Sequence, residues 1–277
     1  MSGKIYVRFW GVRGSIATPG KDTVKYGGNT SCVEVRCGNE IIILDAGTGI
    51  RELGNKLLME KPQHINILFS HFHYDHIEGF PFFSPIFNRN FSVTLIGKPK
   101  LEGTLEQLFG TQLMFPYFPL ALKELDADIA FHEVDRENFI RRGGISIRLE
   151  HLNHPGGCIG YRIEYRGKSF VYATDTEHSD QLDVSLLKLA SHADVLVYDS
   201  NFTDDEYAGK VGTSRSGWGH STWTHGVKIA RTAKVKKLIL FHHDPSHDDR
   251  FIDELEKEAR KEFRESYAAF EGLEIAI

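Results

Sequence analysis

The run from His71 to His76 (HFHYDH) places three imidazoles and a carboxylate directly after the apolar segment Ile65–Phe69. An apolar run of this length followed by polar residues predicts a buried strand that presents functional groups in the loop after it. Side chains two apart on an extended segment point the same way, so His71 and His73 can bind one cation. Asp75 and His76 then project on the other side of the turn and can bind a second. Imidazole and carboxylate ligands suit Zn²⁺, which we expect here, with Mn²⁺ or Fe as alternatives.

The bulk properties are those of an ordinary globular protein. The chain has 277 residues, of which 41% are hydrophobic and 26% charged, and its mean hydropathy is -0.30. We expect one domain spanning residues 1–277. The net charge of -5 does not indicate a broad nucleic-acid-binding surface, which needs a basic excess. Three cysteines form no disulfide framework, no apolar run approaches the ~20 residues that span a bilayer, and no signal peptide is recognised, so we expect a cytoplasmic protein without membrane contact.

The order of strand-like and helix-like segments repeats in the two halves of the chain. In the first half we expect strands at Lys4–Trp10, Ser31–Arg36, Glu40–Leu44, Ile65–Phe69 and Phe91–Ile96, helices at Arg51–Met59 and Leu101–Phe109, and a loop at Met114–Leu120. In the second half we expect strands at Ile145–Leu152, Gly160–Tyr165, Ser169–Ala173, Val195–Tyr198 and Lys237–Phe241, and helices at Val184–Ser191, Thr222–Ala233 and Asp248–Tyr267. This order predicts an α/β fold with two mixed sheets packed face to face and helices on the outer faces, a four-layer αββα sandwich.

Further metal-ligating groups follow other predicted strands. Asp45, His154, Asp175 and His242 each stand at or just after a strand end. Together with the histidine run they suffice for two divalent metal ions, about 3.5–4 Å apart in the enzymes that hydrolyse phosphate esters. One ion would take His71, His73 and His154, the other Asp75, His76 and His242, and Asp175 would bridge them. His243 and His247 remain alternatives to His242, and His151 to His154.

The sequence resembles the metallo-β-lactamase fold superfamily, and within it the ribonuclease Z and cyclic-nucleotide phosphodiesterase branch. The resemblance covers nearly the whole chain. It rests on the segments DAGTG from Asp45, SHFHYDHIEG from Ser70, HPGGCIGYRIE from His154, ATDTE from Ala173, DSNF from Asp199, GHST from Gly219 and LILFH from Leu238. The histidine run is specific for the superfamily, and GHST narrows it to the phosphodiesterase branch.

The resemblance implies a dinuclear metal-dependent phosphodiesterase, in which a hydroxide activated by the metals attacks phosphorus in line. Asp75 would ligate a metal and also accept the proton of the nucleophilic water. His220, in GHST, would protonate the leaving oxygen. Asp45 and Asp199 would fix the orientation of imidazoles. Arg13 is a weak candidate for a phosphate contact.

The spacing of the motifs favours a small substrate. Ribonuclease Z enzymes carry a long arm between the third and fourth motifs that clamps tRNA, whereas His154 and Asp175 are only 21 residues apart (175 − 154). We therefore expect a small-molecule phosphodiester, foremost a 3′,5′-cyclic nucleotide, and no nucleic acid. Aromatic residues could form a wall for stacking on a base; they are Phe80, Phe82, Phe83, Phe87, Phe115, Tyr117 and Phe118.

Three alternatives stay open at this stage. One is a sugar cyclic-phosphate phosphodiesterase, and another is a ribonuclease Z-like endonuclease that processes RNA 3′ ends. The third is a non-catalytic metal-binding domain, which the intact set of ligands disfavours. Relatives in this branch are commonly homodimers, so the resemblance also allows a homodimer.

Overall fold

The computed structural model describes residues 3–98, 103–134 and 139–277, and its strands form two seven-stranded sheets. The first sheet has the order β14-β1-β2-β3-β4-β5-β6. Its strands are β1 (Ile5–Gly11), β2 (Cys32–Cys37), β3 (Glu40–Leu44), β4 (His64–Leu68), β5 (Ser92–Gly97), β6 (Asp128–Glu133) and β14 (Glu274–Ala276). The pairs from β14 to β3 are antiparallel and those from β3 to β6 are parallel, so the sheet is mixed.

The second sheet has the order β13-β12-β11-β10-β9-β8-β7 and mirrors the first. Its strands are β7 (Phe139–Arg142), β8 (Ile145–Leu152), β9 (Cys158–Tyr165), β10 (Lys168–Ala173), β11 (Val195–Asp199), β12 (Leu238–Phe241) and β13 (Ser266–Ala268). The pairs from β7 to β10 are antiparallel and those from β10 to β13 are parallel. Parallel strands carry their following loops at one edge, which is where the polar groups of the motifs gather.

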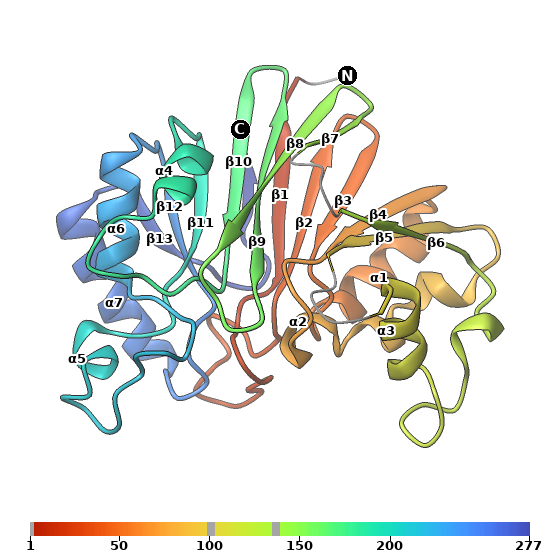
Figure 1. The fold of residues 1–277 in the computed structure, drawn as a ribbon, viewed down its shortest axis with the longest axis horizontal. Coiled ribbons are helices and arrows are strands. Elements are labelled where there is room, and N and C mark those ends of the chain that lie inside the picture. The colour runs from red at the N-terminus through yellow and green to blue at the C-terminus, as the bar shows by residue number, and fades with distance from the viewer. Residues whose placement is uncertain (1–2, 99–102, 135–138) are drawn as a thin grey trace.

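The two sheets face each other and helices cover their outer faces (Figure 1). Helices α1 (Ile50–Glu60) and α3 (Leu105–Gln112) cover the first sheet, and α4 (Val184–Ala190), α6 (Trp223–Thr232) and α7 (Asp249–Glu262) cover the second. Two short helices, α2 (Tyr74–Ile77) and α5 (Asp204–Tyr207), lie in loops, as do the 3₁₀ turns Phe80–Phe82, Ser84–Phe87 and Leu122–Glu124. The main core lies between the sheets and includes the buried side chains of Phe9, Tyr161, Tyr172 and Phe241. The predicted four-layer αββα sandwich is therefore confirmed.

Most predicted elements are present, with bounds shifted by a few residues, but four strands and one helix end differ. We did not predict β6, β7, β13 or β14, and the helix predicted over Asp248–Tyr267 ends at Glu262. β6 is an edge strand of the first sheet and β7 an edge strand of the second. Their residues are mostly exposed, so their sequences lack the apolar pattern of inner strands. Within the predicted helix Leu101–Phe109, residues 101 and 102 lie outside the described residues, and α3 begins at Leu105. Met114–Leu120 is irregular, as predicted.

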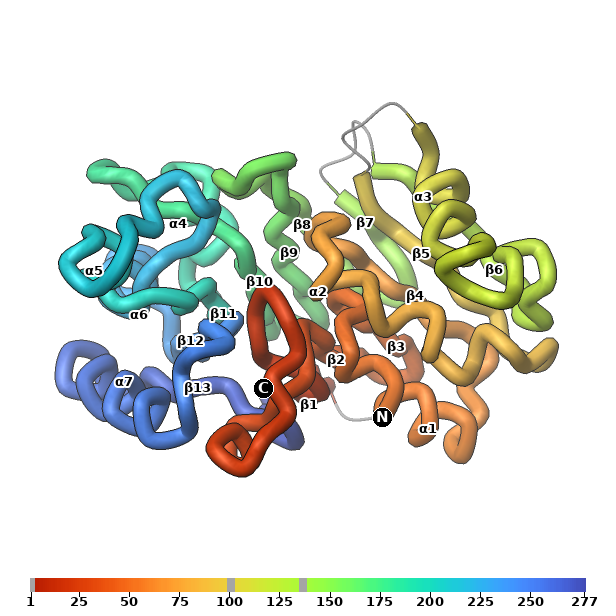
Figure 2. The backbone as a smooth tube through the Cα atoms, turned by 90° about the horizontal axis from the view of Figure 1, so that it is seen from below, coloured from red at the N-terminus to blue at the C-terminus, as the bar shows by residue number. Residues whose placement is uncertain are grey.

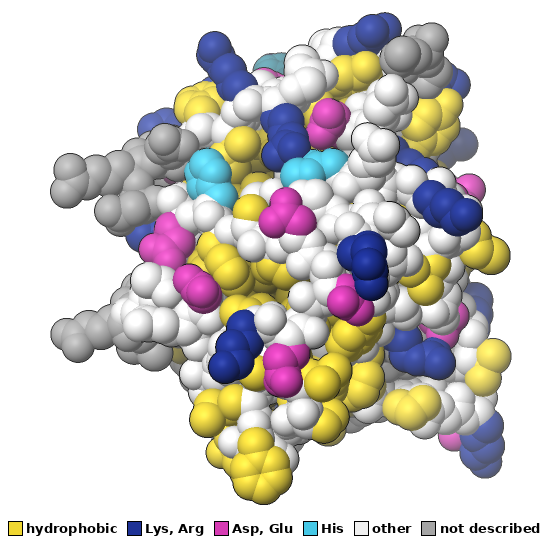
Figure 3. Space-filling model, turned by 90° about the vertical axis from the view of Figure 1, so that its right-hand side faces the viewer, with side chains coloured by type: hydrophobic (Ala, Val, Ile, Leu, Met, Phe, Trp, Pro, Cys, Tyr) yellow, Lys and Arg dark blue, Asp and Glu magenta, His cyan; other side chains and the backbone are white. Residues whose placement is uncertain are grey.

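Among the described helices, none combines the length and the apolar character needed to cross a lipid bilayer. On the face that carries α3 and β6, hydrophobic side chains gather toward the lower part (Figure 3). The segment after α3 carries strongly exposed aromatic side chains, since Phe115 is 84% and Tyr117 78% exposed.

Candidate metal centre

The polar groups of the motifs meet at one edge of the two sheets. β10, β11 and β12 run parallel and in register, with Ala173 opposite Tyr198 and Asp199 opposite Phe241. The loops after these strands therefore carry their polar residues side by side, and the loop after β4 brings the histidine run from the other sheet. The N-terminal segment that follows β1 crosses this edge between the sheets (Figure 2).

Three imidazoles from loops of both sheets form the first group of candidate ligands. The ligand nitrogens of His71, His73 and His154 all lie within 4.8 Å of one another. Nε2 of His154 is 3.1 Å from Nδ1 of His73. Nδ1 of His154 lies 2.7 Å from the carbonyl of Gly219, so it donates to this carbonyl and leaves Nε2 as a free lone pair. This arrangement can accept one cation.

A second group lies beside the first and includes a carboxylate. Oδ2 of Asp75 is 3.1 Å from Nε2 of His242 and 3.3 Å from Nε2 of His76, and the two Nε2 atoms are 3.2 Å apart. The alternatives to His242 belong to none of the groups of clustered ligand atoms in the described residues. Nε2 of His243 donates to the carbonyl of Ala269, and the His247 ring pairs with Glu206. The geometry therefore favours His242.

Asp175 reaches both groups. Its Oδ1 lies 3.7 Å from Nε2 of His71 and 3.9 Å from Nε2 of His154. Its Oδ2 lies 3.2 Å from Nε2 of His76 and 3.4 Å from Nε2 of His242. One buried carboxylate thus stands between all four imidazoles, as a bridging ligand requires.

The donor set fits divalent cations. Nε2 of His71 is buried and has no hydrogen-bond partner among the described residues, which is rare in folded proteins and is expected of a nitrogen that ligates a metal. Burial would raise the pKa of Asp175, but the surrounding histidines outweigh it and hold that pKa well below its usual value. Burial lowers the pKa of His71, which keeps its lone pair available. Ionised carboxylates together with imidazole nitrogens suit Zn²⁺, Mn²⁺ or Fe.

Three residues of this edge adopt the left-handed backbone conformation that non-glycine residues rarely take. The φ angles are 60° for Asp45, 52° for Asp175 and 62° for His242. Each conformation costs about 1–3 kcal/mol and persists only where the surrounding structure enforces it. Each stands directly at or after a strand end, and the sharp turn aims its side chain into the site rather than along the strand.

Asp45 fixes the orientation of the His76 ring by binding the nitrogen that faces away from the second group's other ligands. Its Oδ2 accepts from Nδ1 of His76 at 2.8 Å, and its two oxygens also accept from the backbone N–H and the hydroxyl of Ser70. The buried hydroxyl of Tyr172 donates to Oδ2 as well, at 2.8 Å. With Nδ1 of His76 protonated, its Nε2 points toward Asp75 and Asp175 as a lone pair.

We expect an Asp45→Asn variant to bind divalent metal about 10–100-fold more weakly than wild type, because the His76 ring loses its anionic acceptor. Tyr172→Phe should show a smaller loss. Metal affinity, measured by competition with a chromogenic chelator, tests both.

Tyr161→Phe is the matched control, since Tyr161 is equally buried and its hydroxyl donates to the carbonyl of Phe69 instead of to the site. It should lose about 1 kcal/mol of stability but keep its metal affinity. Equal metal affinity in Asp45→Asn and wild type would contradict the role of Asp45.

His220 and Asp199 form a pair at the rim of the site. Nδ1 of His220 donates to Oδ2 of Asp199 at 2.8 Å, and the same nitrogen is 3.8 Å from Oδ1 of Asp175. Burial lowers the pKa of His220, but the carboxylates of Asp199, Asp175 and Asp75 outweigh burial and raise it to about 9. The imidazole is therefore protonated at neutral pH and its Nε2 can donate a proton.

Arg13 does not take the place that was predicted for it. Its side chain is fully buried and donates to the carbonyls of Gly27, Asp244 and His247. It ties the N-terminal segment to the loop after β12 instead of facing a substrate phosphate.

The neighbours of Arg13 contribute more directly to the site, which we did not predict. The backbone N–H of Ser15 donates to Oδ2 of Asp75 at 2.7 Å. A Cβ added to Gly14 would lie 2.5 Å from the ring of His242, so only glycine fits there.

The predicted aromatic wall is partly wrong. Phe80 and Phe83 are fully buried in the core beneath α1 and α3, whereas Phe82, Phe115 and Tyr117 are exposed. Two exposed aromatic residues that we did not predict stand closer to the motifs. Tyr74, between two candidate ligands, is 82% exposed, and Trp218, two residues before His220, is 51% exposed.

Residues 40–243 match the family described as the Beta-lactamase superfamily domain. The chain belongs to this family. Ribonuclease Z of Thermoplasma acidophilum is 24% identical over 318 residues, which cover 100% of this chain and 98% of that protein. The metallo-beta-lactamase fold protein YhfI of Bacillus subtilis superposes with a TM-score of 0.74 at 20% identity, covering 99% of each chain. A diphosphatase of the PhnP family superposes with a TM-score of 0.70 at 20% identity, covering 98% of this chain and 97% of the other.

These findings confirm the predicted superfamily and the predicted enzyme class, a metal-dependent hydrolase. The family implies divalent cations, and the clustered histidines and aspartates are the groups that could hold them. The roles of the individual residues stay predictions.

Proposed function

We propose that the protein is a dinuclear metal-dependent phosphodiesterase acting on a small cyclic phosphodiester, foremost a 3′,5′-cyclic nucleotide. The observation that carries this proposal is the position of Asp175 between two groups of imidazoles, with the protonated His220 beside it. Two cations held there by His71, His73, His154, Asp75, His76, His242 and Asp175 would lower the pKa of water and neutralise charge on the phosphate.

The residues of the chain supply the proton transfers. Asp75 is nearly fully buried, and the histidines around it outweigh burial and lower its pKa, so it is an anion that can orient a water molecule. Because the bound cations would lower the pKa of that water, Asp75 would also accept its proton. His220 would give the proton on Nε2 to the leaving sugar oxygen. Asp199 holds Nδ1 of His220 and stabilises the imidazolium until that step.

The connection between the third and fourth motifs supports a small substrate. Between His154 and Asp175 the chain forms only the hairpin of β9 and β10, which leaves no room for an arm. The alignment with the Thermoplasma ribonuclease Z spans 318 positions, so about 40 of them (318 − 277) fall in segments that this chain lacks. The net charge of -5 also disfavours a polyanionic substrate.

A second candidate function is processing of RNA 3′ ends, because full-length relatives carry the name ribonuclease Z. A sugar cyclic phosphate remains the alternative within the small-substrate class. Rates on 3′,5′-cyclic AMP, a ribose cyclic phosphate and a tRNA precursor would rank the three.

The deciding experiment is hydrolysis of bis-(p-nitrophenyl) phosphate and 3′,5′-cyclic AMP by metal-loaded protein, with His73→Ala as the control. Turnover of both, lost in the control, is the expected result. Turnover of the nitrophenyl ester alone would turn the search toward sugar cyclic phosphates and RNA. Two bound metals without activity on any phosphodiester would contradict the proposal.

A further inference from the structure

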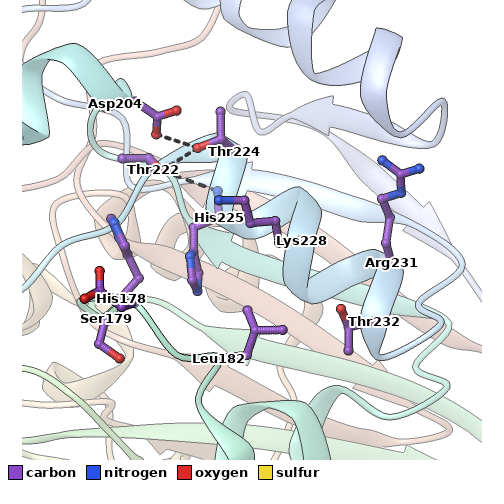
Figure 4. Close-up of a pocket in the computed structure, with 11 residues that line it drawn as sticks. His178, Ser179, Leu182, Asp204, Thr222, Thr224, His225, Lys228, Arg231 and Thr232 are labelled. Atoms are coloured by element: carbon purple, nitrogen blue, oxygen red, sulfur yellow. Dashed lines mark hydrogen bonds between the residues drawn. The ribbon is translucent and has the colours of Figure 1, made fainter.

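A cavity of about 590 Å³ lies behind the loop that carries His220. One wall is α6, the other is the segment from His178 to Leu182, and Asp204 of α5 stands at one end (Figure 4). None of the candidate metal ligands lines it. Its volume falls within the range of sites for small molecules.

An unpaired imidazole faces this cavity. His225 is only 6% exposed, yet its ring nitrogens have no hydrogen-bond partner in the described part of the chain. The ring stacks on His178, with centroids 4.6 Å apart and an angle of 21° between the planes. Burial, with the nearby His178 and Lys228, lowers the pKa of His225 to about 4, so one nitrogen donates and the other accepts. Ring nitrogens that line a cavity without a protein partner are free to bond to a ligand that enters it.

His178 adds a second such group. Its Nδ1 lies 3.0 Å from the hydroxyl of Ser221, which leaves Nε2 without a partner among the described residues. The two stacked rings therefore offer hydrogen-bonding groups side by side, as Figure 4 shows. Neutral imidazoles of this kind suit hydroxyl groups, which both donate and accept.

The charges of the cavity are divided between its ends. His225, Lys228 and Arg231 follow one another at intervals of three residues and share one face of α6. Lys228 has no ion pair within the described ranges, and the only ion pair of Arg231 is an exposed one with Glu262 at 3.6 Å, which contributes little. Asp204 lies at the opposite end from Arg231, where it accepts from Thr224, and Asp180 is a second carboxylate in the lining. The end at Arg231 thus suits an anion and the end at Asp204 suits hydroxyls.

We propose that this cavity binds a phosphorylated sugar of pentose size at a site separate from the candidate metal centre. The phosphate lies on Lys228 and Arg231, where cationic donors form strong hydrogen bonds to phosphate oxygens. The sugar hydroxyls lie against His225, His178 and Asp204. This site does not depend on the proposed activity, because it shares no residue with the proposed catalytic groups.

Calorimetric titration with ribose 5-phosphate tests the site. The titration uses His73→Ala protein treated with chelator, since a loaded metal centre would also bind phosphate. We expect one binding event per chain. Lys228→Gln should raise the dissociation constant at least about tenfold, as loss of a hydrogen bond to a charged group does. His225→Phe keeps the stacked ring but removes its nitrogens, and it should also weaken binding. Thermal unfolding of each variant verifies the fold.

Lys257→Gln, on the exposed face of α7, is the matched control and should bind as the parent does. No binding, or equal binding by Lys228→Gln, His225→Phe and the parent, would overturn the proposal. Inorganic phosphate should bind more weakly than ribose 5-phosphate. Equal binding of the two would show that the hydroxyls are not recognised and would overturn the assignment to a sugar. Because binding is measured without turnover, failure here is distinct from failure of the proposed phosphodiesterase.

Discussion

An Asp175→Asn variant is expected to purify without stoichiometric divalent metal and to hydrolyse phosphodiesters at least about 10³-fold more slowly than wild type. Charge stabilisation by metal ions supplies several kcal/mol of the barrier reduction, and each 1.36 kcal/mol is a factor of ten in rate. Metal content by mass spectrometry and kcat on bis-(p-nitrophenyl) phosphate measure the two effects.

The physical reason is the place of this one carboxylate among four imidazoles. Asp175 is 1% exposed, and its two oxygens approach the Nε2 atoms of both groups. An amide of the same shape keeps the packing but removes the negative charge, and it offers one oxygen instead of two. Both cations would therefore lose a ligand at once, which no other single substitution in the site achieves.

Asp194→Asn is the matched control. Asp194 precedes β11, at the opposite end of this strand from the site, and accepts from the backbone N–H of Ser169 and from Lys236. Its loss should cost about 1 kcal/mol of stability and leave the metal content unchanged. Two tightly bound metals in Asp175→Asn would show that this carboxylate does not bridge them.

The part of the site that could be predicted from the sequence is the part built from strand ends. Asp175 and His242 follow short apolar runs, which predict buried strands. Parallel strands end at a common edge, so the two residues are expected to lie close together. The histidine run needs no long-range information, because its spacing alone brings its side chains together. Fold class followed from the same runs, since the inner strands β3, β4 and β11 consist mainly of apolar residues.

The rest could not be predicted because it depends on contacts between distant segments. Nothing in the sequence around Tyr172 shows that its hydroxyl meets Asp45, 127 residues away. The backbone N–H of Ser15 reaches Asp75 only because the N-terminal segment crosses the edge of both sheets. Arg13 was a weak candidate for a phosphate contact, and its burial could not be predicted because the side chain donates to carbonyls that include those of the distant Asp244 and His247.

A His220→Ala variant is expected to keep its metal content but to lose about 10²–10⁴-fold in kcat on 3′,5′-cyclic AMP. The leaving sugar oxygen is strongly basic and needs a proton as the bond breaks. A nitrophenolate leaves without one, so the loss on bis-(p-nitrophenyl) phosphate should be much smaller. This difference between the substrates separates proton donation from general damage to the site.

His151→Ala is the control for this series, because His151 is an exposed histidine near the end of β8, three residues before His154. It should match wild type in metal content and in both rates. Equal losses on the two substrates in His220→Ala, or wild-type turnover of 3′,5′-cyclic AMP, would remove His220 from the role of proton donor.

The pH dependence of kcat gives an independent measure of the same group. A general acid acts only while protonated, so kcat on 3′,5′-cyclic AMP should fall as the pH rises through the pKa of His220, which is raised to about 9. Cations bound to Asp75 and Asp175 would cancel part of the rise that those carboxylates cause in the pKa of His220. The fall in kcat, the alkaline limb of the profile, would therefore lie below pH 9, whereas Asp199 continues to raise the pKa of His220. An Asp199→Asn variant should therefore shift the limb further toward neutral pH, and His220→Ala should lack it. A limb that persists unchanged in His220→Ala would assign it to another group.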